Sequence, residues 1–216
     1  MRIIDMEKDP RGAHYKYFRS FVNPYVGLTV PCDITPLAGK KPFFLHLAYC
    51  ATKAANSVPE LRRRIVDGQV VEYEHCNSSH TLALENGTYC YCELDYTMDF
   101  PHFLPCAQEA VEQAKNRASI EEHDPVRFFF LSSVPWASYT GLQLPLPSAD
   151  FSNPQITFGK AYWQGERYLL PLSLNVHHGL CDGIHISAFF QRFEEICKQV
   201  AEGGNNGQWT MDNGQL

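Results

Sequence analysis

Residues Asn175 to His185, NVHHGLCDGIH, separate two different periods of apolar side chains and therefore decide how this sequence folds. The residues before this stretch are apolar at every second position, which is the period of a β-strand: Tyr168, Leu170, Leu172, Leu174 and Val176. The residues after it follow the spacing of a helix with one buried face: Ile186, Phe189, Phe190, Phe193, Ile196 and Val200. We therefore expect two adjacent histidines and an aspartate on a strand-to-helix turn.

The two histidines of this turn differ in the direction that strand parity gives them. If the strand continues through the pair, His178 points the same way as the core residues, and His177 shares the other face with Ser173. A lone histidine at the end of an apolar strand is usually a hydrogen-bonded core residue, and Asp182 before a helix is most simply an N-cap. An imidazole, a glycine-containing turn and a carboxylate together, however, can form a general base that works near neutral pH.

The rest of the chain predicts an α/β domain. Further elements follow from apolar periodicity and turn residues: a helix over 42–57, a strand over 69–75 after a turn at Asp67-Gly68, a helix over 107–118, a strand over 126–133, and a hairpin over 155–178 that turns at Gln164-Gly165. We expect one domain over residues 1–200 and a flexible, Gly- and Asn-rich tail over 201–216.

Composition and charge exclude several classes of protein. The chain has 216 residues, of which 44% are hydrophobic and 19% charged, as in a globular domain. The net charge of -6 and the absence of a long Lys/Arg run argue against nucleic acid as a partner. No apolar run approaches the ~18 residues of a membrane span, and the N-terminus is charged. We expect a cytoplasmic protein that does not enter the membrane.

The eight cysteines do not suggest disulfides or a metal site. They are scattered through apolar or helical contexts, so we expect free, mostly buried thiols. Cys76, His80, Cys90 and Cys92 could be assembled into a zinc site, but the chain has no C-x2-C pair, and C-x-C in an alternating stretch is typical of a strand. We therefore expect no metal.

The pattern H-H-x-x-x-D-G at residues 177–183 resembles the active-site motif of the chloramphenicol acetyltransferase family. Other segments match the family in the same order along the chain: Arg11-Gly12-Ala13-His14-Tyr15, Ser132-Ser133-Val134-Pro135-Trp136 and Thr157-Phe158-Gly159-Lys160. The similarity spans roughly residues 10 to 200, and independent matches in the correct order are more specific than any one motif.

This resemblance implies a fold and a reaction. The fold is a two-layer α/β sandwich, with a mixed β-sheet and helices on one side, which assembles as a homotrimer with active sites between subunits. His178 would be the general base that takes a proton from a hydroxyl of chloramphenicol or a similar small alcohol, which then attacks acetyl-CoA directly. Ser132 would donate to the oxyanion, with Thr157 holding a water, and Asp182 would pair with Arg11 to fix the turn.

The resemblance also places ligand-binding residues. Trp136 and Lys160 lie where the family approaches CoA, and Phe18, Phe130 and Cys90 lie near its acceptor pocket. The stretch Thr81 to Glu93 departs from the family pattern, which leaves the acceptor open. The alternatives are a family member with a different acceptor, a lipoyl-type acyltransferase core, which shares a similar motif, and a non-catalytic protein that binds CoA or a small molecule.

Overall fold

The computed structural model of the chain describes residues 1–121, 124–148 and 150–203, so most of the predicted tail lies outside the described residues. Its main sheet contains, in spatial order, β2 (Tyr25–Asp33), β10 (Arg167–His177), β8 (Gln155–Phe158), β7 (Phe128–Ser133), β5 (Asn77–Ala83) and β6 (Tyr89–Leu94), with β9 (Tyr162–Gln164) paired to the start of β10. β10 is antiparallel to β2 and β8, whereas β7 is parallel to β8 and β5. The sheet is therefore mixed, as predicted.

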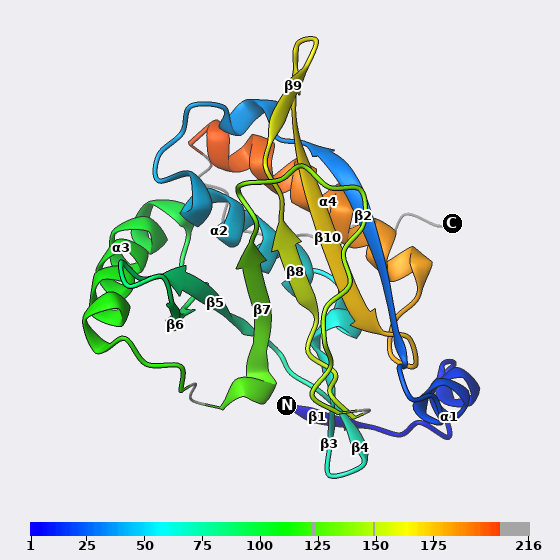
Figure 1. Ribbon diagram of the computed structural model, residues 1–216. Coiled ribbons are helices and arrows are strands. Elements are labelled where there is room, and N and C mark those ends of the chain that lie inside the picture. The colour runs from blue at the N-terminus through cyan, green and yellow to red at the C-terminus, as the bar shows by residue number, and fades with distance from the viewer. Residues whose placement is uncertain (122–123, 149, 204–216) are drawn as a thin grey trace.

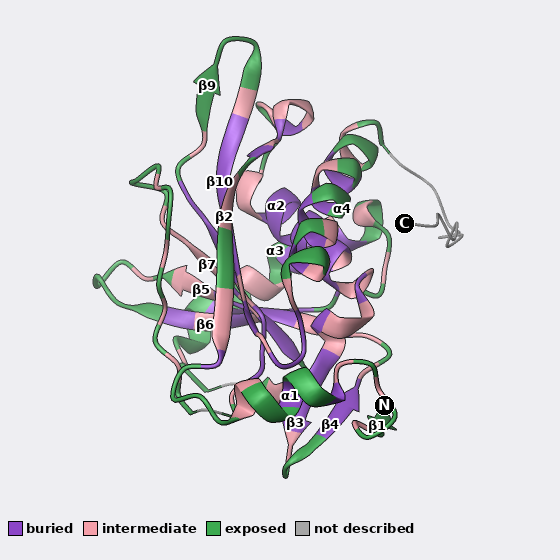
Figure 2. Ribbon diagram, turned by 90° about the vertical axis from the view of Figure 1, so that its right-hand side faces the viewer, coloured by how far each residue is buried: buried purple, intermediate pink, exposed green. Residues whose placement is uncertain are grey.

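Helices cover one face of this sheet. They are α2 (Phe43–Asn56), α3 (Phe100–Arg117) and α4 (Gly183–Ala201), and Figure 2 shows all three on the same side of the strands. A shorter helix, α1 (Gly12–Arg19), lies at the end of the sheet where β10 stops, and residues 134–148 cross the face opposite the helices (Figure 1). The predicted two-layer sandwich is confirmed.

A second, smaller sheet lies below the main one in Figure 1. It contains β1 (Arg2–Ile4), β4 (Gln69–Glu72) and β3 (Arg63–Val66), of which the sequence predicted β4 alone. Arg63 joins this sheet to the N-terminal segment, because its guanidinium lies 3.2 Å from Asp9 and 3.3 Å from Glu72. Short 3-10 helices complete the fold at Thr35–Leu37, Pro59–Arg62 and Pro125–Arg127.

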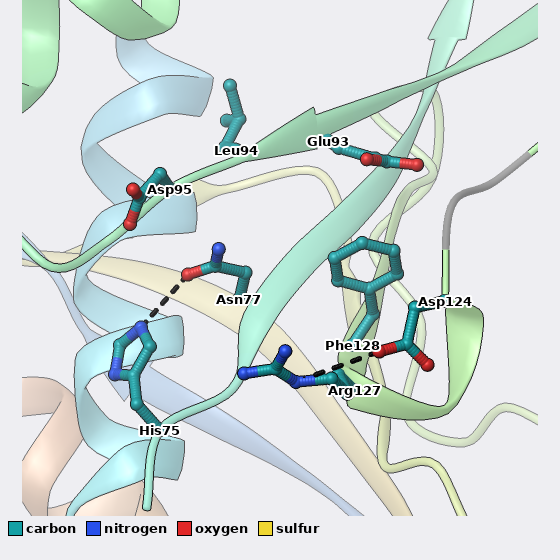
Figure 3. Close-up of a pocket in the computed structure, with 8 residues that line it drawn as sticks. All are labelled: His75, Asn77, Glu93, Leu94, Asp95, Asp124, Arg127 and Phe128. Carbon is teal, nitrogen blue, oxygen red and sulfur yellow. Dashed lines mark hydrogen bonds and ion pairs between the residues drawn. The ribbon is translucent and has the colours of Figure 1, made fainter.

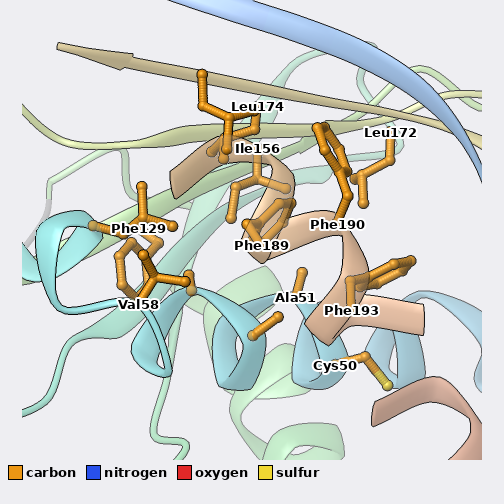
Figure 4. Close-up of a cluster of buried hydrophobic side chains, with 14 of the residues drawn as sticks. Cys50, Ala51, Val58, Phe129, Ile156, Leu172, Leu174, Phe189, Phe190 and Phe193 are labelled. Carbon is orange, nitrogen blue, oxygen red and sulfur yellow. The ribbon is translucent and has the colours of Figure 1, made fainter. Parts of the chain in front are cut away.

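The core forms between the sheet and the helices, as Figure 4 shows. Leu172, Leu174 and Ile156 point from the sheet toward Phe189 and Phe193 of α4, and all five are fully buried. Each such side chain contributes about 1.5–3 kcal/mol on burial. The small side chains of α2 allow α4 to pack closely against it: Ala48, Ala51, Ala54 and Ala55. The alternating apolar residues of β10 and the helically spaced apolar residues of α4 thus pack into one core.

Two boundaries differ from the sequence expectation. α3 begins at Phe100 rather than at residue 107, because the carboxylate of Asp99 accepts the backbone N–H of His102 and Pro101 occupies the first turn, where its missing N–H costs nothing. β10 ends at His177, so His178 does not continue the strand as the parity argument assumed. The hairpin turn is confirmed at Gly165, which has a φ of 61°.

Two further observations concern the cysteines and the possibility of a membrane-spanning helix. All eight cysteines are free, and seven of them are buried, as predicted. Within the described part of the chain, none of the helices combines the length and the apolar character needed to span a membrane.

Candidate active site

His178 is held in one orientation by contacts from three segments. Its backbone N–H donates to the Pro24 carbonyl at 2.8 Å, which anchors the turn to the residue before β2. Its ring Nδ1 lies 3.0 Å from the Cys181 carbonyl, and the Phe18 ring stacks on it with centroids 3.9 Å apart. Because a carbonyl can only accept, the proton lies on Nδ1, and Nε2 remains unprotonated in the neutral ring. The imidazole is thus preset as a base at Nε2.

Arg11 closes the turn that carries this histidine. Its Nη1 pairs with a carboxylate oxygen of Asp182, and its Nη2 donates to the His178 carbonyl at 2.8 Å. The other carboxylate oxygen accepts the backbone N–H of Ile184 at 3.2 Å, so Asp182 is also the N-cap of α4. Burial disfavours the charged carboxylate, but the hydrogen bond and charge of Arg11 outweigh it and hold the pKa of Asp182 below its usual value.

Gly12 allows Arg11 to reach this position. A Cβ at Gly12 would lie 1.9 Å from the Met6 carbonyl oxygen, so the preceding turn packs directly on the glycine backbone. Any larger residue would push α1 away from the N-terminal segment. In the Arg11-Gly12 pair, the arginine therefore binds the turn that carries His178, and the glycine allows the close packing on Met6 that places it there.

A row of hydroxyl side chains crosses four adjacent strands on the face opposite the helices. Ser132 pairs with Thr157, Thr157 with Ser173, and Ser173 with Thr29, whose hydroxyl oxygen lies 2.7 Å from that of Ser173. Cross-strand partners share a face, and the next residues in each strand, such as Leu131, point into the core. Thr157 Oγ1 is buried and has no hydrogen-bond partner among the described residues. It is free to hold a water or a ligand oxygen.

Two cavities meet at Ser132. The first has a volume of about 560 Å³ and is mostly apolar, with Phe130, Leu144 and Phe151 among its walls and Thr157 at its floor. The second has a volume of about 1010 Å³ and extends from Phe44 to Trp136. Ser132 lines both cavities, together with His80, Thr81 and Tyr89, so a group bound in one cavity can meet a group bound in the other near Ser132. Such an arrangement fits a reaction between two substrates.

The structure keeps His178 apart from Ser132 within one chain. His178 lies five positions after Ser173, which stands in the hydroxyl row, and at about 3.3 Å per strand residue this separates the two groups by roughly 16 Å. Neither cavity that meets at Ser132 includes His178 in its lining. The predicted site residues therefore form two groups, one around the imidazole and one around the hydroxyl row.

The predicted ligand-binding residues are placed as follows. Phe130 lines the smaller cavity, and Trp136, with 79% of its surface exposed, lines the larger one. Phe18 belongs to the His178 group, through the stacking described above. Lys160 is exposed and does not line either cavity, although its backbone N–H donates to the Ala137 carbonyl next to Trp136.

Cys90 does not line either cavity that meets at Ser132, whereas the sequence analysis placed it near a binding pocket. It is fully buried, and its thiol lies 3.5 Å from the Ala114 carbonyl of α3. Successive residues of β6 point to opposite faces, so Tyr89 and Tyr91 line the smaller cavity in its place. The alternation Tyr-Cys-Tyr-Cys in the sequence could have revealed this, because two aromatics at one parity mark one face.

A separate pocket of about 370 Å³ contains mainly charged and polar residues (Figure 3). His75 Nε2 lies 2.9 Å from Asn77 Oδ1, and Arg127 pairs with Asp124 at 3.8 Å, so these polar groups satisfy one another. No serine, threonine or cysteine lines the pocket. Within the described residues, no group of three or more His, Cys, Asp or Glu side chains could hold a metal ion. We assign no chemistry to this pocket.

Comparisons with known proteins identify the family to which the sequence is similar. The family model "Chloramphenicol acetyltransferase" matches residues 1–194. Curated chloramphenicol acetyltransferases from Klebsiella sp and from Escherichia coli are each 28% identical over 208 residues, covering 93% of this chain and 95% of the relative. One from Campylobacter coli is 30% identical over 200 residues, covering 89% of this chain and 96% of the relative.

Solved structures show the same fold. A structure named chloramphenicol acetyltransferase has a TM-score of 0.78 and 30% identity, and the match covers 91% of this chain and 99% of that one. Azotobacter vinelandii dihydrolipoamide acetyltransferase has a TM-score of 0.64 at 20% identity, covering 88% of each chain, which indicates a shared fold.

Proposed function

The chain belongs to the chloramphenicol acetyltransferase family, and we propose that it transfers the acetyl group of acetyl-CoA to a hydroxyl of chloramphenicol or a similar small alcohol. The observation that carries this proposal is the meeting of two cavities at Ser132, one mostly apolar and lined by several aromatic rings, the other larger and lined in part by Trp136. The smaller cavity suits an aromatic acceptor, and the larger one suits acetyl-CoA as co-substrate.

The reaction follows from the chemistry of the two residue groups. Nε2 of His178 takes the proton of the acceptor hydroxyl, whose oxygen attacks the thioester carbonyl. The resulting oxyanion accepts a hydrogen bond from the Ser132 hydroxyl, and Thr157 Oγ1 holds a water at the same site. Collapse of the intermediate breaks the C–S bond, and the CoA thiolate takes the proton back from the imidazolium. Arg11 and Asp182 keep the imidazole in place throughout.

The protein acts as a homotrimer in this proposal, with His178 of one subunit facing Ser132 of the next. The separation of roughly 16 Å between the two groups within one chain supports this arrangement. The outer edge of β2 is unpaired in the described chain, and Leu28 on this strand is 45% exposed. A long edge strand with exposed apolar side chains is a site of association with another chain.

Subunit complementation tests the shared site. The variants His178→Ala and Ser132→Ala should each be inactive alone, and mixed trimers, formed by refolding the two together, should recover part of the wild-type rate. Recovery requires that one subunit supplies the base and another the hydroxyl. A mixture as inactive as its components would contradict the shared site, provided that size exclusion confirms that trimers have formed.

The reaction itself is tested by release of the CoA thiol. Purified protein with acetyl-CoA and chloramphenicol should release free thiol, and His178→Ala should abolish this release. His102→Ala is a suitable control, because His102 is exposed at the start of α3. A wild-type protein that is silent toward chloramphenicol but active toward another hydroxylated compound would retain the reaction class and replace the named acceptor.

A different acceptor within the same family is the second candidate, because the smaller cavity contains polar atoms without hydrogen-bond partners among the described residues. Ser79 Oγ and Gln155 Oε1 are both buried and line this cavity on either side of Phe130. They would favour an acceptor with a donor group at that end. A panel of hydroxylated aromatic compounds with and without such a donor distinguishes the two candidates by kcat/KM.

A further inference from the structure

His177, the first histidine of the pair, lies beside the proposed base but takes no part in the reaction described above. It is the last residue of β10, and 1% of its surface is exposed. It lines neither of the two cavities that meet at Ser132. A buried polar ring normally has hydrogen-bond partners, and one partner of the His177 ring lies in the turn that carries His178.

The His177 imidazole accepts a hydrogen bond from this turn. The backbone N–H of Gly179 donates to His177 Nδ1 at 3.1 Å. Because a backbone N–H can only donate, Nδ1 of His177 carries no proton. His178, by contrast, carries its proton on Nδ1, which donates to the Cys181 carbonyl. The two adjacent histidines therefore use Nδ1 in opposite ways, the first as an acceptor and the second as a donor.

Close packing holds the His177 ring against the turn. A Cβ at Gly179 would lie 2.9 Å from Cε1 and 3.0 Å from Nδ1 of His177, and 3.2 Å from the Cα of Tyr15. The ring of Tyr25, on the neighbouring strand β2, meets the His177 ring edge to face, with centroids 6.1 Å apart. The His177 ring thus contacts both the turn and the adjacent strand, which fixes the position of its acceptor nitrogen.

The backbone of His177 holds the same turn. The N–H groups of Leu180 and Cys181 donate to the His177 carbonyl at 2.9 Å and 3.0 Å. Together with the ring, His177 therefore accepts hydrogen bonds from three successive backbone N–H groups, those of residues 179, 180 and 181. The Cys181 carbonyl that accepts from His178 Nδ1 belongs to this turn, so its position depends on these contacts.

We propose that His177 is a positioning residue, whose ring Nδ1 holds the turn so that the Cys181 carbonyl selects the His178 tautomer with an unprotonated Nε2. This inference rests on the proposed use of His178 as the base. Without an acceptor at residue 177, the Gly179 N–H loses its partner, and the turn relaxes away from His178 Nδ1. A neutral His178 ring that carries its proton on Nε2 cannot take the proton of the acceptor hydroxyl there.

Two variants of nearly equal shape test this assignment. His177→Leu removes the acceptor, whereas His177→Asn has the same branching as leucine and keeps a side-chain oxygen that can accept the Gly179 N–H. His177→Leu should lower kcat about tenfold, the factor that one net hydrogen bond provides. Both KM values should stay unchanged, because His177 lines neither cavity. His177→Asn should recover most of the lost kcat.

Nitrogen NMR of protein with isotope-labelled histidines reports the tautomer directly. The His178 signals are identified by their loss in His178→Ala. They should show a protonated Nδ1 and an unprotonated Nε2 in the wild type and in His177→Asn, and partial protonation of Nε2 in His177→Leu. This measurement needs neither substrate, so it is independent of the proposed reaction.

The outcomes separate positioning from packing and from the reaction itself. A folded His177→Leu with the wild-type tautomer and kcat overturns the assignment, and so does a His177→Asn as impaired as His177→Leu. Melting temperatures identify a variant that fails to fold, in which case His177→Met and His177→Gln replace the first pair. A wild type that shows the expected tautomer, and loses it in His177→Leu, but transfers no acetyl group supports the assignment and contradicts the proposed function alone.

Discussion

Arg11 and Asp182, which are 171 positions apart in the chain, form an ion pair that closes the turn carrying His178. The same guanidinium also donates to the His178 carbonyl, so one side chain fixes both ends of the turn. Asp182 in turn caps α4, and the ion pair thereby connects the N-terminal segment, the end of β10 and the start of the last helix. The orientation of the proposed base depends on this contact.

Replacing Arg11 should therefore reduce both stability and activity. Arg11→Ala leaves the Asp182 carboxylate and the His178 carbonyl without their donor, which costs about 1–3 kcal/mol in the free energy of unfolding. Urea unfolding measures this loss, and kcat should fall more than KM rises because the imidazole is misplaced rather than absent. Arg192→Ala, which removes an exposed pair within α4, is the control. Equal effects of the two substitutions would contradict the role of Arg11.

The ion pair should also make stability depend on pH in acid. The folded-state pKa of Asp182 lies below its unfolded value of about 3.9, so its contribution is complete above that value and is lost as the pH falls through the folded pKa. The difference in unfolding free energy between wild type and Asp182→Asn should therefore stay constant from pH 7 to about pH 4 and shrink as the pH falls below about 4. A difference that also stays constant well below about pH 4 would show that the charge of Asp182 does not stabilise the fold.

Ser132→Ala should affect turnover more than binding. Loss of one donor to a developing oxyanion lowers kcat by about a hundredfold to a thousandfold. KM for either substrate should change little, because the hydrogen bond forms mainly in the transition state. Ser187→Ala, on the exposed side of α4, is the matched control. A Ser132→Ala enzyme with near wild-type kcat would show that a group other than Ser132 donates to the oxyanion.

Trp136→Ala should weaken acetyl-CoA binding without destabilising the protein. Its side chain is 79% exposed at the rim of the larger cavity, where an aromatic face can stack on adenine for about 1–3 kcal/mol. KM for acetyl-CoA should rise about tenfold, Trp136→Phe should recover most of the loss, and the melting temperature should stay constant. A drop in melting temperature instead would assign Trp136 to folding.

Cys90→Ala should affect stability and Tyr89→Ala should affect substrate binding, although the two residues are adjacent. Cys90 is fully buried against α3, so its truncation should cost about 1 kcal/mol of stability and leave KM for the acceptor unchanged. Tyr89 is half exposed and lines both cavities, so its truncation should raise KM and leave stability unchanged. Steady-state kinetics and thermal melting of the two variants check the face assignment of β6.

Much of the fold was readable from the sequence because the signals are local. The alternation from Tyr168 to Val176 and the helical spacing after Gly183 gave β10 and α4 almost to the residue. The same locality explains the errors. Apolar periodicity did not reveal where α3 begins, since Asp99 and Pro101 set this through capping, and it did not reveal the small sheet, whose strands are short.

The sequence by itself determined which residues are proposed to carry the chemistry, because His178, Asp182, Ser132 and Thr157 lie in motifs whose spacing is recognisable in one dimension. The tertiary structure decided how they are grouped. Strand register placed Ser132 beside Thr157, whereas His178 follows the end of β10, five residues after Ser173, and the pleat of β6 turned Cys90 into the core and Tyr89 outward. Register and pleat depend on pairing between distant segments, which no local pattern contains.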